Sequence, residues 1–273
     1  MFKALAIFLL VVSLSFASEK ILKDLETAWN YYEKGQFYEM KKLSEKILKK
    51  SLEEKFPKGI VEGYYYLGIA NFSLGNIPEA LEYANKTIEF SKKYNRYRWK
   101  AYGHALAGEI LRSLRKYDEA LSHFKKAYKL AVSNNNKKMI PPALINIGNI
   151  YYDKRNLKKA VDYYKQALKY AEGINLRKSY IAFINYNIGI TYYRMKNYKE
   201  AVKFLEKSIS LYKEIGNKKS QIEAKFYTAK AYMKEGNKEK AKEIFTQIIN
   251  ETKKGFIHKR AKYFLKKLEK NKS

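Results

Sequence analysis

A small residue returns about every forty positions along this chain of 273 residues. The series consists of Ala28, Gly68, Gly108, Gly148, Gly189 and Ala229. A second series follows twelve residues behind and consists of Met40, Ala80, Ala120, Ala160, Ala201 and Ala241. In both series the successive differences are 40, 40, 40, 41 and 40. Two series that share one period predict six copies of a single structural unit.

Each copy has the pattern of two helices joined by a tight turn. In the fourth copy, apolar residues recur at helical spacing over 143–152, and Gly148 and Tyr151 belong to that face. A second helix is predicted over 157–171, with Ala160 and Tyr164 on one face. The other copies repeat this pattern, so we expect an all-α fold.

The turn inside each copy contains glycine or asparagine. Glycine occupies it at Gly35, Gly75 and Gly236, and the fourth and fifth copies have Asn156 and Asn197. Glycine tolerates the left-handed conformation that ends a helix, and asparagine is the next best choice for it. We therefore expect left-handed residues at these turns.

The small residues predict a close crossing of the two helices in each copy. A large side chain at the crossing would hold the two backbones apart. We expect the glycine or alanine of the first helix to meet the alanine of the second helix, with aromatic side chains on either side.

These features together resemble the tetratricopeptide repeat (TPR) family. Leu67-Gly68, and Ile147-Gly148 with Tyr151, are similar to its first-helix signature. The second-helix signature is matched by three pairs: Ala120 with Phe124, Ala160 with Tyr164, and Ala241 with Phe245. The resemblance implies a right-handed α-solenoid of six TPR-like helix-turn-helix repeats with a C-terminal capping helix.

The period of 40 exceeds the usual 34, and the proline that commonly closes the second helix is absent. Long-period arrays of this kind resemble those of kinesin light chains, spindle-orientation adaptors and bacterial peptide-sensing regulators. That resemblance implies binding of a peptide or protein segment in a concave groove, although a fold does not fix a function.

The pattern divides the chain into three parts. Residues 1–17 are predicted to be a secretory signal peptide, and residues 18–256 to hold the six repeats. The approximate repeat boundaries are 21–60, 61–100, 101–140, 141–181, 182–221 and 222–256. Residues 257–273 are predicted to be a capping helix and tail, with Ala261, Phe264 and Leu268 on the apolar side of the helix.

The first residues have the pattern of an export signal. Lys3 precedes an uncharged run, and the small residues Ser15 and Ala17 favour cleavage after Ala17. The run is shorter than the roughly 20 residues of a membrane-spanning helix, but an uncleaved anchor is the alternative. We expect an exported protein of the periplasm or cell envelope. The absence of cysteine excludes a disulfide.

The chain carries 56 Lys+Arg against 27 Asp+Glu, a net charge of +29. Pairs of adjacent lysines are spread along the predicted solvent-facing positions. One interpretation is a solvated surface. The alternative is attraction to anionic lipid or polymer of the envelope. Nucleic acid is not favoured, because no helix carries a stripe of basic residues interleaved with aromatic ones.

In the TPR fold the first helices line the groove. Matching each copy to the family places a set of aromatic, amide and lysine residues there: Tyr65, Phe72, Asn146, Asn149, Tyr152, Tyr186, Asn187, Tyr193, Phe226 and Lys230. Asn146 and Asn187 hold equivalent positions, and an asparagine amide can bond both polar groups of an extended peptide backbone. The resemblance to the long-period arrays implies such a clamp. The alternatives are that these asparagines bond a neighbouring helix and that the aromatic residues only pack.

The inventory of catalytic and metal-binding motifs is empty. Three histidines, His104, His123 and His258, lack metal-ligand spacing, and no nucleophile or phosphate-binding motif occurs. We expect neither an enzyme nor a cofactor or metal site. The sequence thus predicts an exported scaffold that binds a protein or peptide of unknown identity in its groove. The alternatives are electrostatic binding of the envelope through the basic exterior and a sensor of a peptide signal.

Overall fold

The computed structural model describes residues 2–270, with side chains from residue 18 onward. Its described residues form α-helices and one short 3-10 helix, η1 (Lys137–Met139). The chain divides into two compact units, unit 1 (Met1–Asn136) and unit 2 (Lys137–Ser273), which are described separately below. The predicted signal peptide, residues 1–17, lies outside the described side chains, and it stays a prediction.

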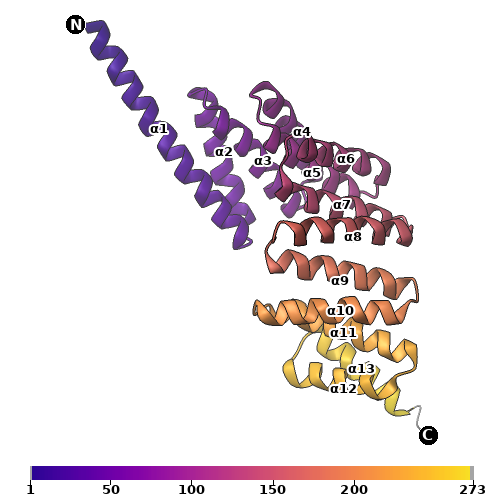
Figure 1. Cartoon of the computed structure of the whole chain (residues 1–273). Helices are drawn as coiled ribbons and strands as arrows, with labels where there is room; N and C mark the ends of the chain where they lie inside the picture. The colour runs from indigo at the N-terminus through magenta and orange to yellow at the C-terminus, as the bar shows by residue number, and fades with distance from the viewer. Residues whose placement is uncertain (1, 271–273) are drawn as a thin grey trace. The chain divides into compact units, whose positions relative to one another are not determined.

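Unit 1 consists of three helical hairpins, whose successive antiparallel helices can be followed in Figure 1. The helices are α1 (Phe2–Glu33), α2 (Phe37–Glu53), α3 (Pro57–Leu74), α4 (Ile77–Lys93), α5 (Tyr97–Ser113) and α6 (Tyr117–Ser133). One apolar cluster joins α1, α2 and α3 around Ile21, Met40 and Ile47, and another joins α3, α4 and α5 around Ala84 and Ile110. Each hairpin therefore shares its core with the next hairpin in the unit.

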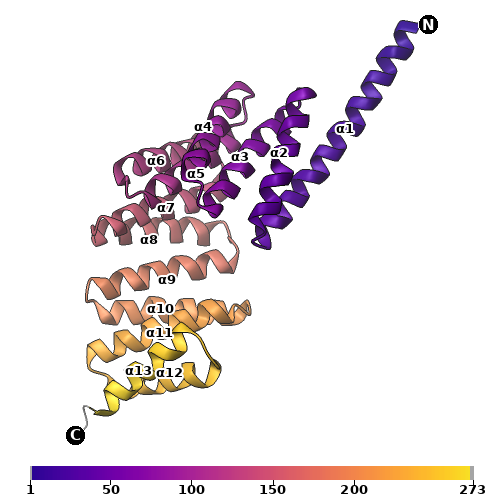
Figure 2. The same cartoon turned by 180° about the vertical axis from the view of Figure 1, so that it is seen from behind.

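Unit 2 contains three further hairpins and a last helix, seen from behind in Figure 2. The helices are α7 (Ile140–Asp153), α8 (Leu157–Gly173), α9 (Lys178–Arg194), α10 (Tyr198–Glu214), α11 (Lys218–Glu235), α12 (Lys238–Glu251) and α13 (Phe256–Lys270). Ala261 and Leu268 of α13 are buried in a cluster with Phe226 and Phe245. The expected amphipathic helix at the C-terminal end is confirmed.

The small repeat residues are buried as expected, but the partner of the glycine differs between the copies. All members of the second series, Met40 and five alanines, have no exposed surface. A Cβ on Gly108 would lie 2.7 Å from the Phe124 ring. The glycine thus faces the aromatic residue one turn beyond the repeat alanine. In that copy the glycine makes room for a ring. In the fifth copy a Cβ on Gly189 would lie 3.1 Å from the backbone oxygen of Ala201, so the expected contact between glycine and alanine is present there.

The left-handed residue of the turn is not always the one that we expected. Gly35, Gly75 and Gly236 have positive φ, but in the fourth and fifth copies the left-handed residues are Arg155 and Lys196. The asparagines come one position later and begin the next helix: Asn156 and Asn197 accept hydrogen bonds from the backbone N–H groups of Lys159 and Glu200. Asparagine is used here as an N-cap, because its oxygen satisfies a donor of the first turn. The expectation of a left-handed asparagine is wrong.

Candidate functional site

In unit 2 the predicted binding residues lie on α7, α9 and α11, the first helices of its three hairpins. Ring and cation contacts connect these helices. Arg194 at the end of α9 lies over Tyr152 of α7, and Tyr193 of α9 contacts Tyr227 of α11. We call this surface the first-helix face of unit 2. Its members are Asn146, Tyr152, Tyr186, Asn187, Tyr193, Tyr227 and Lys230.

The two asparagines proposed as a clamp are not used to join helices. Among the described residues, no hydrogen bond involves the side chain of Asn146 or Asn187, and both residues are half-buried. The Nδ2 of Asn187 is buried without a partner in that part of the chain. A buried donor without an acceptor costs about 1–3 kcal/mol. The fold therefore leaves one hydrogen-bonding group of Asn187 unused.

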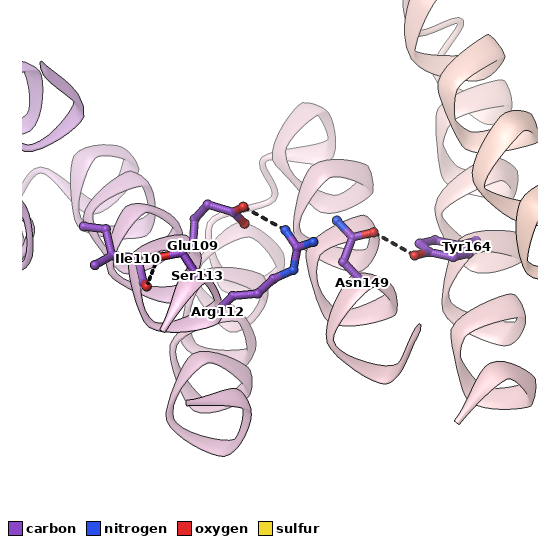
Figure 3. Close-up of polar contacts among 6 residues, drawn as sticks. All are labelled: Glu109, Ile110, Arg112, Ser113, Asn149 and Tyr164. Carbon is purple, nitrogen blue, oxygen red and sulfur yellow. Dashed lines mark hydrogen bonds and ion pairs between the residues drawn. The ribbon is translucent and has the colours of Figure 1, made fainter. Parts of the chain in front are cut away.

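The side chain of Asn149, in contrast, is hydrogen-bonded within the fold. Its Oδ1 accepts a hydrogen bond of 2.7 Å from the hydroxyl of Tyr164 on α8, as Figure 3 shows. This bond joins the two helices of one hairpin. The carbonyl of Asn149 is therefore occupied by the fold. Figure 3 also shows an ion pair within α5 of unit 1, where Arg112 donates to Glu109 over 2.7 Å.

Tyr152 lies under a guanidinium group. The Cζ of Arg194 is 4.3 Å from the centre of the Tyr152 ring, a distance typical of a cation–π contact. Burial raises the pKa of the Tyr152 hydroxyl, and Arg194 opposes that shift. The pair presents a flat aromatic and cationic surface of α7 and α9.

Tyr186 is held by an acidic residue of the next first helix. Its hydroxyl donates to the Oε1 of Glu223 on α11 over 2.9 Å, and its ring meets Tyr227 edge to face. Burial raises the pKa of this hydroxyl well above its usual range, and Glu223 raises it further. Tyr186 therefore stays neutral and its ring is fixed in position.

Lys230 is surrounded by rings. Its Nζ lies 5.0 Å from the centre of Tyr193 and 5.1 Å from that of Tyr227, and Phe226 and Phe264 are also within 6 Å. No carboxylate pairs with it among the described residues. Burial lowers the pKa of Lys230, and the nearby cations Arg260 and Lys234 lower it further. A half-buried ammonium without a counter-charge is a ready site for an anion or a carbonyl oxygen.

Phe226 was expected to contact a ligand in the groove, but its side chain is buried inside unit 2. It is only 4% exposed, and its ring packs on Phe245 and Phe264. One edge reaches a hollow of about 440 Å³ between α11 and α13. The hollow is lined by Tyr227, Phe256, Arg260 and other residues of these two helices and the loop before α13. Phe226 mainly supports this part of unit 2 from within.

Tyr65 and Phe72 belong to α3 of unit 1. Tyr65 takes part in an aromatic cluster with Tyr66, Trp99 and Tyr102, with ring centres 5.2 to 6.0 Å from its own. Phe72 is half-buried against the cluster that contains Ala84 and Ile110. Both residues therefore contribute to the packing of unit 1.

Sequence reasoning missed three residues that shape the first-helix face. Glu223 lies one helical turn before Tyr227, so extending the face of α11 toward its start could have found it. Arg194 and Arg260 had no such signal. Their positions depend on how α9 packs on α7 and how α13 folds back on α11.

The described residues contain neither a metal-binding cluster nor a membrane-spanning helix. No group of three or more His, Cys, Asp or Glu residues in that part of the chain could hold a metal ion. No helix within the described residues has the length and apolar character required to cross a membrane.

Comparison with known sequences identifies the repeat. The sequence profile of the tetratricopeptide repeat matches residues 100–173 and 180–250, which is more than half of the chain. The regulatory protein RapF of Bacillus subtilis is 31% identical over 88 residues. That match spans 32% of this chain and 21% of RapF, so it covers about a fifth of that relative.

Solved structures show the same fold. A signal transduction ATPase with numerous domains from Pyrococcus horikoshii, with a tetratricopeptide repeat sensor, matches 95% of this chain with a TM-score of 0.80 at 22% identity. The match covers 40% of that protein. The apo quorum sensor NprR from B. thuringiensis matches 90% of this chain and 68% of its own, with a TM-score of 0.69 at 19% identity. These likenesses confirm the all-α TPR-like solenoid fold.

Proposed function

Because the chain belongs to the tetratricopeptide repeat family, we propose that it binds a peptide or an extended protein segment on the first-helix face of unit 2. The observation that carries the proposal is the unpartnered Nδ2 of Asn187. The Nδ2 is buried beneath the face, so the amide turns outward when a peptide binds. A peptide carbonyl then accepts its hydrogen bond and removes the cost of the unpaired donor. Similarity to regulatory and sensor proteins supports the proposal.

The neighbouring residues complete a surface suited to a peptide. Tyr193 and Tyr227 offer ring faces and edges for apolar side chains. Lys230 offers a partly desolvated ammonium, which forms stronger hydrogen bonds than a fully hydrated one. We assign Asn187 to the peptide backbone, the tyrosines to apolar side chains, and Lys230 to a carbonyl or carboxylate oxygen of the ligand. Asn146 offers the equivalent amide on α7.

The test is selection from a displayed library of random linear peptides on the full chain. Asn187→Ala and Lys230→Ala are the test variants. Asn250→Ala is a matched control, because Asn250 is exposed on the second helix α12. Lys240→Ala is the other control, because Lys240 of α12 also lies over a tyrosine ring, 5.1 Å from the centre of Tyr232.

Peptides that bind the wild type and both controls, but bind the two test variants at least about fivefold more weakly, would support the proposal. Enrichment of the same peptides on all variants would refute it, and so would failure to enrich any sequence.

The basic exterior supplies a second candidate, in which the chain binds anionic lipid or polymer through its excess of 29 positive charges. Salt separates the two functions. Binding through exposed lysines is screened within about 8 Å at physiological ionic strength and falls steeply as salt is added. Binding that depends on the Asn187 amide should change little. A vesicle of anionic phospholipid is the probe for the second function.

A further inference from the structure

The helix α13, labelled and drawn in yellow in Figure 2, has one side in the core of unit 2 and the other side exposed. Ala261 and Leu268 on the inner side are buried. The opposite side consists of exposed residues at helical spacing: Phe256, Lys259, Tyr263, Lys266, Lys267 and Lys270. We call these residues the outer face of α13. They are lysines and aromatic residues, and no acid is among them.

The two aromatic side chains of the outer face are unusually exposed. Phe256 is 71% exposed and Tyr263 is 63% exposed. Among the large hydrophobic residues that the structure describes, only Tyr38 of α2 is comparable, at 68%. Their spacing along the helix places Phe256 and Tyr263 on the same side, about 10 Å apart. A helix that closes a repeat array only for solubility has a polar outer side. The two rings therefore indicate a contact surface.

The lysines make the outer face strongly positive. Lys259, Lys266 and Lys267 form no ion pair with any residue that the structure describes. Glu269 is the single acid of α13, and helical spacing places it outside the arc of the outer face. A partner that matches this face in charge therefore presents several negative groups along one side of a helix.

The exposed rings restrict which polyanion fits. A single strand of nucleic acid is held in a groove, whereas the outer face of α13 is the convex side of one helix. A DNA duplex offers phosphates to the lysines but no apolar layer to the rings. An anionic bilayer offers both, because headgroup phosphates lie next to the boundary of the acyl chains. The combination of lysines and exposed rings therefore favours a lipid surface.

The outer face is already ordered before any contact. The inner side of α13 is fixed in the core cluster of unit 2. The Cζ of Arg260 lies 5.2 Å from the centre of the Phe256 ring, and Tyr263 meets Phe264 edge to face with ring centres 5.3 Å apart. Binding to a membrane therefore does not require the helix to fold, a cost that a disordered segment has to meet.

We propose that the outer face of α13 binds the surface of an anionic phospholipid bilayer, with its lysines on headgroup phosphates and with Phe256 and Tyr263 at the boundary of the acyl chains. The proposal rests on the second candidate function, the binding of anionic lipid, and assigns that function to one helix. It is independent of peptide binding on the first-helix face of unit 2. The sequence-based expectation that no helix carries a stripe of basic residues interleaved with aromatic ones is wrong for α13.

The test is sedimentation of the full chain with vesicles of phosphatidylglycerol and phosphatidylcholine, and with vesicles of phosphatidylcholine alone. The wild type should bind only the anionic vesicles. Phe256→Ser/Tyr263→Ser should bind them about tenfold more weakly, because the burial of two rings is lost. Tyr38→Ser is the matched control, since it removes an equally exposed ring from α2, and its affinity should stay within about twofold of the wild type.

The charges are tested in the same assay. Lys266→Gln/Lys267→Gln should weaken binding about 25-fold, because each lysine near an anionic leaflet strengthens binding about fivefold. Lys125→Gln/Lys126→Gln is the matched control, since both of these adjacent lysines are exposed on α6. It lowers the net charge by the same amount, and it should weaken binding by no more than about threefold.

The position of the rings has its own measurement. Tyr263→Trp adds a fluorophore to the outer face, and its emission is compared with that of the wild type, whose tryptophans are Trp29 and Trp99 of unit 1. Anionic vesicles should shift the added emission to shorter wavelength, because the ring leaves water. An unchanged spectrum in the bound state would overturn the placement of the rings.

Three further results would overturn the proposal. Equal binding of the wild type and all variants to anionic vesicles would leave the second candidate function with the basic exterior as a whole and remove it from α13. Absence of binding to these vesicles would refute the proposal together with that function. Binding of a DNA duplex, but not of vesicles, would assign the lysines to nucleic acid. Circular dichroism of each variant verifies that it is folded.

Discussion

Gly148 of α7 faces the ring of Tyr164 on α8 so closely that a Cβ on Gly148 would lie 2.6 Å from Cε1 of Tyr164. Real Cβ atoms do not approach a ring carbon to this distance, so the Tyr164 ring or one of the two helices must move if a side chain is added. The repeat glycine is therefore a requirement of helix packing and not of backbone conformation.

Gly148→Ala should lower the free energy of unfolding by about 1–3 kcal/mol, because the added methyl overpacks the crossing of α7 and α8. Gly173→Ala is the control, since a Cβ at this helix-terminal glycine meets no atom within 4 Å. The control should be neutral or stabilising by about 0.5 kcal/mol. Urea unfolding of both variants is the measurement. Equal effects would show that the close contact with Tyr164 carries no cost.

Alanine substitutions of Asn149 and Asn187 should have different effects on the stability of the fold. Asn149→Ala removes the acceptor of the Tyr164 hydroxyl and should destabilise the chain by about 1–3 kcal/mol. Asn187→Ala removes a donor that has no partner, so stability should stay the same or rise by up to about 1 kcal/mol. Thermal and urea unfolding compare them. A larger loss of stability for Asn187→Ala would mean that its amide is bonded in the fold.

The turn residue Lys196 has φ of 63°, a conformation that costs an L-residue roughly 1–2 kcal/mol. Lys196→Gly should stabilise the chain by about 0.5–1 kcal/mol, after the greater freedom of glycine in the unfolded chain is counted. Gly236→Ala makes the opposite change at a position with φ of 97° and should destabilise it. The urea concentrations at the unfolding midpoints of the two variants should move in opposite directions. A shift of both midpoints to a lower urea concentration would contradict this account.

Glu62 should make folding sensitive to pH. Its pKa is about 7 in the folded chain, raised by burial from 4.5, so the folded state binds the proton more tightly. Its contribution to stability is present in full below pH 4.5 and is lost as pH rises through 7. Glu62→Gln should therefore match the wild type at pH 4.5 and exceed it by up to about 3 kcal/mol at pH 8.

The measurement for Glu62 is urea unfolding of wild type and Glu62→Gln at both pH values. Glu89→Gln is the control, because Glu89 is an exposed carboxylate on the second helix α4 of the same unit. The free energy of unfolding of the control should differ from that of the wild type by no more than about 0.5 kcal/mol. This difference should be the same at both pH values. A Glu62→Gln variant that is less stable than the wild type at pH 8 would contradict the assignment.

The forty-residue period was sufficient to predict the helical hairpins and the buried small residues, and the apolar spacing after residue 256 predicted the amphipathic α13. It did not predict that Gly148 faces Tyr164 rather than Ala160, because the spacing gives a helix face and not the tilt of one helix on the other. It also did not distinguish Asn149 from Asn187. Both match the groove positions of the family, and only the packed structure shows that one amide is bonded and the other is not.

Glu62 was not found from the sequence for a related reason. A single acid in a mainly apolar helix gives no periodic signal. The three cations around it come from two separate segments of the chain: Lys58, Arg96 and Arg98. Arg260 is similar, because its contact with the Phe226 ring depends on the return of α13. Features that depend on contacts between distant segments of the chain can be identified only from the structure.

The central claim is that the amide of Asn187 bonds a peptide on the first-helix face of unit 2. Its most direct test is calorimetric titration of a display-selected peptide into the wild type, Asn187→Ala and Asn250→Ala, at low and moderate salt. We predict that Asn187→Ala binds about five- to tenfold more weakly, that Asn250→Ala is unchanged, and that moderate salt has little effect. Equal affinity of all three proteins, lost together when salt is added, would contradict the claim and assign binding to the basic exterior.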